Sequence, residues 1–288
     1  MPSEIIGVVG AGVMGSALAQ SIASAGFAVI LVDHSPQALE RARGRVRQQL
    51  RAQRLLRGTP GAAVEEVLAR IEFSQILTSL SGADLVIENV PEKPDIKQEV
   101  FGNLDRTCRP ACVLAANTSC ISITWLGSLT ARPDRVVGLH FMNPVWSKLL
   151  VEVVRGAHTS EATLARARSF LARLGKESLV VEDSPGFVIN RVLMLAINEA
   201  VFLVQEKVAA TEDVDTLFRQ CVGHKMGPLE TADLIGLDTV LDSLQVLATT
   251  FGDPKFRAAP LLRRMVDAGL LGRKSGKGFY RYDAGDPS

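Results

Sequence analysis

The chain has 288 residues, 47% of them hydrophobic, and its 32 Lys and Arg against 31 Asp and Glu give a net charge of +1. Such a chain can bury a sizeable core, and its balanced charge offers no field to attract nucleic acid or a membrane surface. Four cysteines without a C-x-x-C pair and four scattered histidines argue against a metal site and favour a reducing, cytoplasmic compartment.

The first predicted elements lie in an uncharged stretch from Ile5 to Val32. Its many Gly, Ser and Gln residues argue against a membrane span, and the acid at Glu4 is unlike the basic start of a signal peptide. The apolar runs 5–9 and 28–32 are typical of buried parallel strands. The alanine-rich segment 13–25 between them predicts a helix.

The turn between the first strand and the helix follows the pattern G-x-G-x-x-G over residues 10–15. Its candidate cofactor-binding residues are Gly10, Gly12, Val13, Met14 and Gly15. After a strand and before a helix, this pattern predicts dinucleotide binding, because the bare backbone and the helix N-terminus can accept a pyrophosphate. Asp33 ends the second strand, where a carboxylate would bond the adenosine ribose. No arginine follows it immediately, so the pattern favours NAD over NADP.

A long arginine-rich helix is predicted from Pro36 to Arg57. Beyond it, apolar runs predict strands at 85–88, 113–115, 136–141 and 149–154, with helical segments at 97–105 and 161–174. Strands that alternate with helices predict an α/β fold with a doubly wound parallel sheet of Rossmann type, over residues 1–183.

The character of the chain changes after Val181. The segment 183–186 (DSPG) reads as a capping sequence, with proline in the first turn of a helix from Phe187 to about Gln205. This helix is apolar nearly all round, which is typical of a core or an interface. The rest of the chain is mostly helical in pattern, so a smaller all-helical C-terminal domain is predicted over residues 184–288.

A histidine and a glutamate on successive predicted strands form a candidate catalytic pair. His140 stands at a strand end, where open α/β sheets bind ligands. Glu152 lies inside an apolar run, where an acid without a partner is costly. If paired, the glutamate would fix the tautomer of a histidine that serves as acid and base for an alcohol carbon. Spacing alone equally allows two unrelated polar residues at strand ends.

At these residues the chain resembles the L-3-hydroxyacyl-CoA dehydrogenase family, notably its short bacterial 3-hydroxybutyryl-CoA members. The resemblance covers nearly the whole chain. It rests on ordered motifs: GAGVMGSALAQ (Gly10–Gln20), ENVPEK (Glu88–Lys93), ANTSCISIT (Ala116–Thr124), GLHFMNPVWSKLLVEV (Gly138–Val153), DSPGFVINR (Asp183–Arg191), MGPLETADLIGLDT (Met226–Thr239) and GRKSGKGFYRY (Gly272–Tyr282). It implies NAD as the cofactor and a helical C-terminal domain that completes the substrate cleft and pairs two subunits.

The resemblance also implies roles for single residues. His140 is the general base in oxidation and the general acid in reduction, and Glu152 orients it. Ser119 matches a serine that bonds the substrate oxygen, and Asn190 matches an asparagine that helps position it. As alternatives, Ser119 could cap the next helix and Asn190 could be a residue of a helical first turn. Two further residues match positions close to the nicotinamide: Glu92 and Asn117.

Two segments depart from the family pattern. Where the family commonly reads H-F-F-N-P-V-P-V-M-K-L-V-E, this chain has Met142, Trp146 and an early Lys148, so an unusual acyl group is expected. On the long helix, one stripe consists of four arginines: Arg43, Arg47, Arg51 and Arg54. The stripe suits CoA phosphates, an acidic acyl carrier protein or a solvated face. The family's CoA-binding lysine and small polar residue have no match near the end of this helix.

Three functions compete at this point. The first is an NAD-dependent dehydrogenase that acts on a 3-hydroxyacyl thioester of CoA, of the 3-hydroxybutyryl-CoA class. The second applies the same chemistry to an acyl group on a carrier protein, as in polyketide extender-unit pathways. The third is a catalytically silent NAD-binding relative, against which the presence of His140, Glu152, Ser119 and Asn190 argues. A homodimer is expected in each case.

Overall fold

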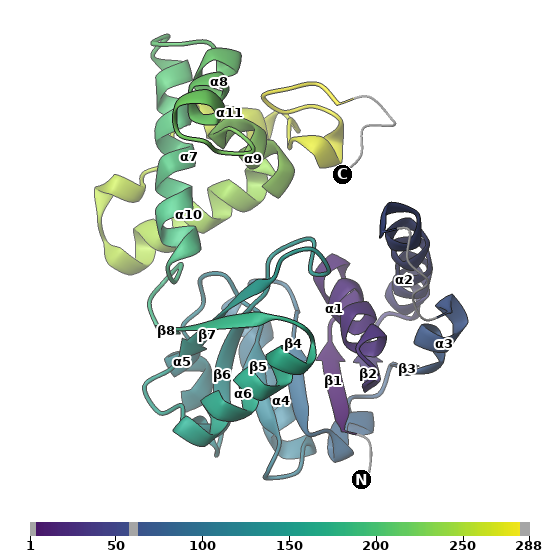
Figure 1. Cartoon of the computed structure of the whole chain (residues 1–288). Coiled ribbons are helices and arrows are strands. Elements are labelled where there is room, and N and C mark those ends of the chain that lie inside the picture. Colours follow the sequence, from purple (N-terminus) through teal and green to yellow (C-terminus); the bar gives the residue numbers. More distant parts are fainter. Residues whose placement is uncertain (1–3, 58–62, 283–288) are drawn as a thin grey trace. The chain divides into compact units, whose positions relative to one another are not determined.

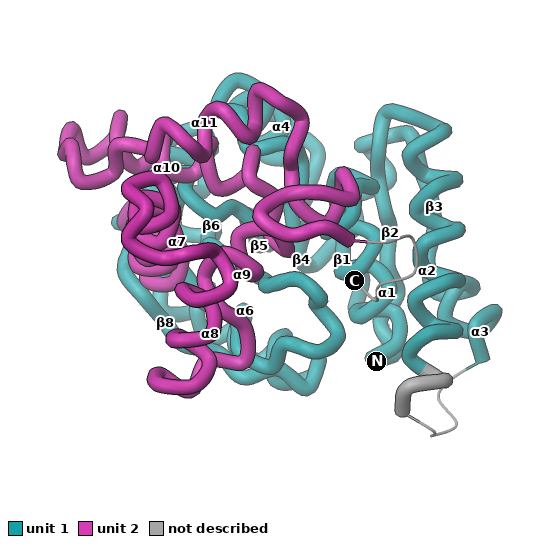
Figure 2. Tube along the Cα trace, turned by 90° about the horizontal axis from the view of Figure 1, so that it is seen from above, with its two compact units in different colours: residues 1–183 teal, residues 184–288 magenta. Residues whose placement is uncertain are grey.

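The computed structural model describes residues 4–57 and 63–282, apart from the side chains of residues 54–57. The chain divides after Asp183 into two compact units, residues 1–183 and 184–288 (Figure 1, Figure 2). Each unit encloses a hydrophobic core of its own.

Unit 1 is built on one eight-stranded sheet in the order β3-β2-β1-β4-β5-β6-β7-β8. The strands are β1 (Ile5–Val9), β2 (Ala28–Val32), β3 (Ile71–Ser74), β4 (Leu85–Glu88), β5 (Val113–Ala116), β6 (Val136–His140), β7 (Leu150–Arg155) and β8 (Glu177–Glu182). Neighbouring strands are parallel except β6 and β7. The chain builds the sheet outward from β1 in one direction and then from β4 in the other, so the predicted doubly wound fold is confirmed.

The sequence pattern missed the two edge strands. β3 has only four residues, of which one is fully buried, and β8 contains no fully buried residue. Neither strand therefore shows the continuous apolar run of a strand covered on both faces. The antiparallel pairing of β6 with β7 was not predicted either, because an apolar run carries no information on strand direction.

Helices cover both faces of this sheet. They are α1 (Val13–Ser24), α2 (Pro36–Arg57), α3 (Val64–Ala69), α4 (Pro94–Thr107), α5 (Ile123–Ser128) and α6 (Glu161–Arg173), with short 3₁₀ helices at Leu77–Gly82 and Pro133–Arg135. α1 and α6 lie on one face, and α4 and α5 lie on the other (Figure 1). On the first face, the rings of Phe27 and Phe170 pack edge to face with centroids 5.6 Å apart.

The turn from β1 into α1 depends on its glycines. Gly10 has a φ of +95°, a conformation that other residues rarely adopt. A Cβ atom on Gly15 would lie 1.8 Å from the carbonyl oxygen of Gly10. The first turn of α1 can therefore pack this closely against the Gly10 backbone only because residue 15 has no side chain. A Cβ on Gly12 would meet no protein atom within 4 Å. Val13, which is exposed, and Met14 open the first turn of α1.

Unit 2 is helical. Its helices are α7 (Ile189–Gln205), α8 (Thr211–Cys221), α9 (Pro228–Ile235), α10 (Leu237–Phe251) and α11 (Pro260–Asp267), with short 3₁₀ helices at Pro254–Phe256 and Arg273–Ser275. In the part of the chain that is described, no single helix is long and apolar enough to cross a membrane. α9 and α10 meet that test only when the bent pair is taken together.

The predicted start of α7 is wrong. The helix begins at Ile189 rather than Phe187, because Gly186 and Phe187 both have positive φ values, +76° and +47°. Asp183 does not cap this helix. Its carboxylate instead accepts hydrogen bonds from the Ser122 hydroxyl (2.7 Å) and from two backbone N–H groups at the start of α5 (3.1 and 2.8 Å).

Candidate active site

A histidine and a glutamate face each other across the antiparallel pair β6 and β7. His140 ends β6 in direct register with Glu152 of β7, and its Nδ1 lies 2.7 Å from Glu152 Oε2. Only 4% of His140 and 5% of Glu152 is exposed. A buried carboxylate at this distance favours the proton on Nδ1, which leaves Nε2 as the nitrogen for proton exchange.

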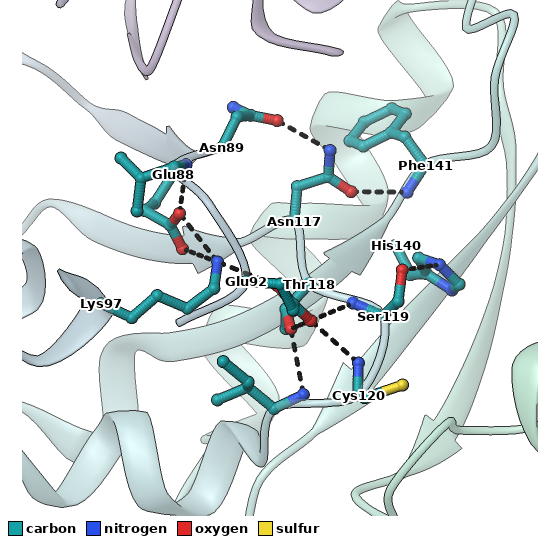
Figure 3. Close-up of polar contacts among 12 residues, drawn as sticks. Glu88, Asn89, Glu92, Lys97, Asn117, Thr118, Ser119, Cys120, His140 and Phe141 are labelled. Carbon is teal, nitrogen blue, oxygen red and sulfur yellow. Dashed lines mark hydrogen bonds and ion pairs between the residues drawn. The ribbon is translucent and has the colours of Figure 1, made fainter. Parts of the chain in front are cut away.

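Ser119 lies on the Nε2 side of the same imidazole. Its Oγ is 3.2 Å from His140 Nε2 (Figure 3), so Ser119, His140 and Glu152 form one line of hydrogen bonds. The alternative in which Ser119 caps the next helix is wrong. Ser122 is the N-cap of α5, and its side chain accepts a hydrogen bond from the backbone N–H of Trp125 at 3.1 Å.

Asn117 joins the carboxyl ends of three neighbouring strands. It follows β5, its Nδ2 donates to Asn89 Oδ1 after β4 (2.7 Å), and its Oδ1 accepts from the Phe141 backbone after β6 (3.1 Å) (Figure 3). The amide therefore holds the sheet edge at which His140 lies. The position of Asn117 beside a nicotinamide stays a prediction.

Glu92 holds the turn that carries Ser119. Its Oε1 accepts hydrogen bonds from the backbone N–H groups of Ser119 (2.9 Å) and Cys120 (3.1 Å) and from the Thr118 hydroxyl (Figure 3). One carboxylate oxygen therefore engages three successive residues. As for Asn117, a position near the nicotinamide stays a prediction.

Sequence reasoning missed a buried ion pair beside this turn. Lys97 of α4 and Glu88 at the end of β4 are both fully buried, and Lys97 Nζ lies 2.8 Å from each oxygen of Glu88. Burial raises the pKa of the Glu88 carboxyl, and the Lys97 ammonium opposes that rise. An acid at the end of an apolar strand was a signal for Glu88, just as an acid inside an apolar run was the signal for Glu152. Nothing in the pattern of α4 separates Lys97 from a solvated lysine.

Asp33 and the glycine turn fit an NAD molecule. The Asp33 carboxylate accepts hydrogen bonds from the backbone N–H groups of Ala11 (2.8 Å) and Ser35 (2.9 Å). An ionised carboxylate has about four lone-pair sites, so acceptor capacity remains for ribose hydroxyls. The open space at Gly12 suits the approach of a pyrophosphate. Arg45 of α2, a residue that sequence reasoning missed, donates to the Ala11 carbonyl at 3.2 Å.

The arginine stripe on α2 is partly engaged by contacts inside unit 1. Arg47 Nε lies 3.3 Å from a carboxylate oxygen of Glu65, and the Arg43 guanidinium lies 4.4 Å from the centre of the Phe73 ring. Arg51 is exposed, and the side chain of Arg54 lies outside the described residues. The stripe is therefore less available to a ligand than its spacing suggested.

A buried lysine holds the segment after His140 that departs from the family pattern. Lys176 Nζ donates to the carbonyl oxygens of Val145 and, at 2.6 Å, of Lys148. Trp146, between these two residues, is half-buried. The backbone of the expected acyl-binding segment is therefore anchored to unit 1.

Asn190 belongs to unit 2, where it is the second residue of α7 and is half-buried. This position matches the alternative of a first-turn residue, and its predicted role towards the substrate stays a prediction. Within the described residues, no group of three or more His, Cys, Asp and Glu side chains is placed to hold a metal ion.

Two family models together span the chain. The NAD binding domain of 3-hydroxyacyl-CoA dehydrogenase matches residues 5–184, and the C-terminal domain of the same family matches residues 186–282. A probable 3-hydroxybutyryl-CoA dehydrogenase of Bacillus subtilis is 46% identical over 283 residues, which cover 98% of this chain and 99% of the relative. A 3-hydroxybutyryl-CoA dehydrogenase of Bradyrhizobium diazoefficiens is 42% identical over 282 residues, 98% of this chain and 96% of the relative.

Solved structures agree. FadB2 of M. tuberculosis superposes with a TM-score of 0.94 at 39% identity, and (S)-3-hydroxybutyryl-CoA dehydrogenase of Ralstonia eutropha with 0.90 at 41% identity. Each match covers 98% of this chain and 99% of the other. The resemblance read from the motifs is thereby confirmed, as is the NAD-binding nature of the first domain. The chain belongs to the 3-hydroxyacyl-CoA dehydrogenase family.

Proposed function

We propose that this protein is an NAD-dependent oxidoreductase that interconverts a 3-hydroxyacyl and a 3-oxoacyl thioester of CoA, of the 3-hydroxybutyryl-CoA class. The observation that carries the proposal is the line of hydrogen bonds from Ser119 through His140 to Glu152. It supplies the acid–base group that dehydrogenation of an alcohol requires. The names of relatives at 42% and 46% identity support the substrate class.

In this mechanism, His140 Nε2 takes the proton of the substrate hydroxyl during oxidation and returns it during reduction. Glu152 holds the imidazole in the required tautomer and stabilises the imidazolium that forms. The Ser119 hydroxyl, 3.2 Å from Nε2, donates to the substrate oxygen and keeps it within reach of that nitrogen. Asn190 is assigned a role in positioning the substrate by its match to the family motif.

When bound, NAD supplies the hydride acceptor, and NADH the hydride donor. The N-terminus of α1 and the bare backbone at Gly12 would hold the pyrophosphate. Asp33 would accept hydrogen bonds from the adenosine ribose, and Glu92 and Asn117 would shape the sheet edge at which the nicotinamide binds. These assignments rest on the open space at Gly12, on the remaining acceptor capacity of Asp33 and on the family motif.

The function is tested by comparing carriers of one acyl group. We expect the enzyme to reduce acetoacetyl-CoA with NADH, and to do so with a kcat/KM at least about tenfold above that for a truncated pantetheine thioester. The reason is that CoA carries phosphate groups that the truncated thioester lacks, and the names of the relatives support CoA as the carrier.

Two outcomes of this comparison would count against the proposal. A carrier-protein thioester that is turned over far faster than acetoacetyl-CoA would show that the CoA assignment is wrong. An absence of turnover with all three carriers, in a protein that binds NADH, would identify a catalytically silent relative.

Cofactor preference is expected to follow Asp33. The wild-type enzyme should use NADH at least about tenfold more efficiently than NADPH, because a 2′-phosphate would meet the Asp33 carboxylate. Asp33→Ala should narrow that preference. The measurement is kcat/KM for each cofactor at saturating acetoacetyl-CoA. Equal use of both cofactors by the wild type would disprove the ribose role, and Asp33→Asn controls for loss of the bond to the Ala11 N–H.

We further propose a homodimer formed through unit 2. This unit exposes several large apolar side chains in the single chain: Val188, Ile189, Val192, Val208, Leu217, Val222 and Leu234. Large apolar side chains exposed on a folded unit are candidates for burial in an interface. Sedimentation should give twice the chain mass of 31.0 kDa, and Val192→Asp should shift the protein towards the monomer. A wild-type mass of one chain would contradict the proposal.

A cytoplasmic location is part of the same proposal. The four cysteines form no disulfide bond within the described residues, and three of them are buried. This pattern is typical of proteins from a reducing compartment. Cell fractionation with antibodies to the protein would check the location.

A further inference from the structure

The ammonium group of Lys97 lies between the carboxylates of Glu88 and Glu92, beside the turn that carries Ser119. Lys97 Nζ is 2.8 Å from both oxygens of Glu88 and 3.4 Å from Glu92 Oε2 (Figure 3). The Lys97 side chain is fully buried. Lysine is rarely buried without a specific partner, and here the two carboxylates are its partners. The two carboxylates come from different segments, since Glu88 ends β4 and Glu92 lies in the loop before α4.

The two oxygens of Glu92 have separate partners. Oε2 faces Lys97, whereas Oε1 accepts from the N–H groups of Ser119 and Cys120 and from the Thr118 hydroxyl. Thr118 in turn accepts from the backbone N–H of Ile121 at 3.1 Å. Lys97 therefore holds the carboxylate that holds the turn. Hydrogen bonds to an ionised group are shorter and stronger than neutral ones, so the turn is firmly placed.

Glu88 anchors the other end of this network. Its Oε1 accepts from the backbone N–H of Val90 at 2.6 Å, and both its oxygens contact Lys97. Lys97 thus ties the end of β4, and the loop that follows it, to the turn after β5. The carboxyl ends of β4 and β5 lie at the same end of the sheet as His140, the last residue of β6.

We propose that Lys97 and Glu92 are positioning residues that set the Ser119 hydroxyl at hydrogen-bond distance from His140 Nε2, where it can hold the substrate oxygen. The proposal rests on the proposed function, because it assigns Lys97 and Glu92 a role through Ser119. Neither residue touches the reacting atoms in this account. A shift of the turn by about 1 Å would misplace the hydroxyl that holds the substrate oxygen, and errors of that size can cost about a hundredfold in rate.

The experiment measures Lys97→Met and Glu92→Gln, each in the wild-type and in the Ser119→Ala background. In the wild-type background each substitution should lower kcat about tenfold or more. The dissociation constant of NADH, from fluorescence titration, should change less than about threefold in Lys97→Met, because the proposed function does not place Lys97 in the cofactor site. In the Ser119→Ala background the same substitutions should lower kcat less than about twofold further. The matched control is Lys93→Met, an exposed lysine of the same loop, which should leave kcat unchanged.

Each other outcome overturns a defined part of the proposal. Losses that multiply with that of Ser119→Ala would show that Lys97 and Glu92 act independently of Ser119. A large loss of NADH affinity in Lys97→Met with unchanged kcat would assign Lys97 to the cofactor site instead. If Lys97→Met does not fold, Glu92→Gln alone decides, because Glu92 is partly exposed.

The failure of this inference can be told apart from that of the proposed function. If Ser119→Ala itself leaves kcat unchanged, the assigned role of Ser119 is wrong and the inference fails with it. If Ser119→Ala lowers kcat but Lys97→Met and Glu92→Gln do not, only the inference is wrong. The double substitution Glu88→Gln with Lys97→Met removes both charges of the buried pair, so no unpaired carboxylate is left in the core. It should show the same loss of kcat as Lys97→Met.

Discussion

Replacing His140 with alanine is expected to lower kcat by about two to four orders of magnitude, the range typical of a positioned acid–base group. The imidazole contacts both Ser119 and Glu152. If Glu152 acts through His140, the double variant His140→Ala with Glu152→Gln should be little worse than His140→Ala alone. The measurement is kcat with acetoacetyl-CoA and NADH for the wild type, both single variants and the double variant.

His158→Ala is the control for this series, because His158 is exposed on unit 1 and lies outside the sheet edge that carries His140. It should retain the wild-type kcat. Thermal unfolding of every variant separates a catalytic loss from a folding loss, since removal of one partner of a buried charged pair can cost about 3–5 kcal/mol. Losses that multiply fully in the double variant would show that His140 and Glu152 are not coupled.

The second large effect is expected in the glycine turn, where substitution of either of two glycines should weaken NADH binding but only one substitution should destabilise the fold. A methyl group on Gly15 would lie 1.8 Å from the Gly10 carbonyl oxygen, so backbone must move. Gly15→Ala should therefore lower the free energy of unfolding by about 1–3 kcal/mol, the usual cost of overpacking. It should also weaken NADH binding about a hundredfold or more, equivalent to about 2.7 kcal/mol, because the start of α1 is displaced.

Gly12→Ala provides the matched comparison. No protein atom lies within 4 Å of its Cβ position, so the unfolding temperature should stay at the wild-type value. NADH affinity should nevertheless fall, because the new methyl group occupies the space in which the pyrophosphate approaches the backbone. NADH titration and thermal unfolding of both variants test the pair. Unchanged NADH affinity in Gly12→Ala would show that the dinucleotide does not bind at this turn.

The local pattern of the sequence was sufficient wherever short-range chemistry decides the structure. The glycine motif between two uncharged apolar runs predicted β1, α1, β2 and the dinucleotide turn, because each of these features depends on neighbouring residues. The same kind of reasoning failed at α7. DSPG has the composition of a helix cap, but the Asp183 carboxylate bonds the start of α5, a distant segment that no local pattern could identify.

Patterns in the sequence were sufficient to identify the Rossmann class of the first domain, the helical character of the second, the family and the candidate residues His140, Glu152 and Ser119. The antiparallel direction of β7 relative to β6 is evident from the three-dimensional structure alone, and this direction brings Glu152 into register with His140. Only the tertiary structure placed Lys97 between Glu88 and Glu92. The physical reason is that strand direction and the burial of a charge depend on partners far away in the chain, whereas periodicity and turn chemistry depend on neighbours.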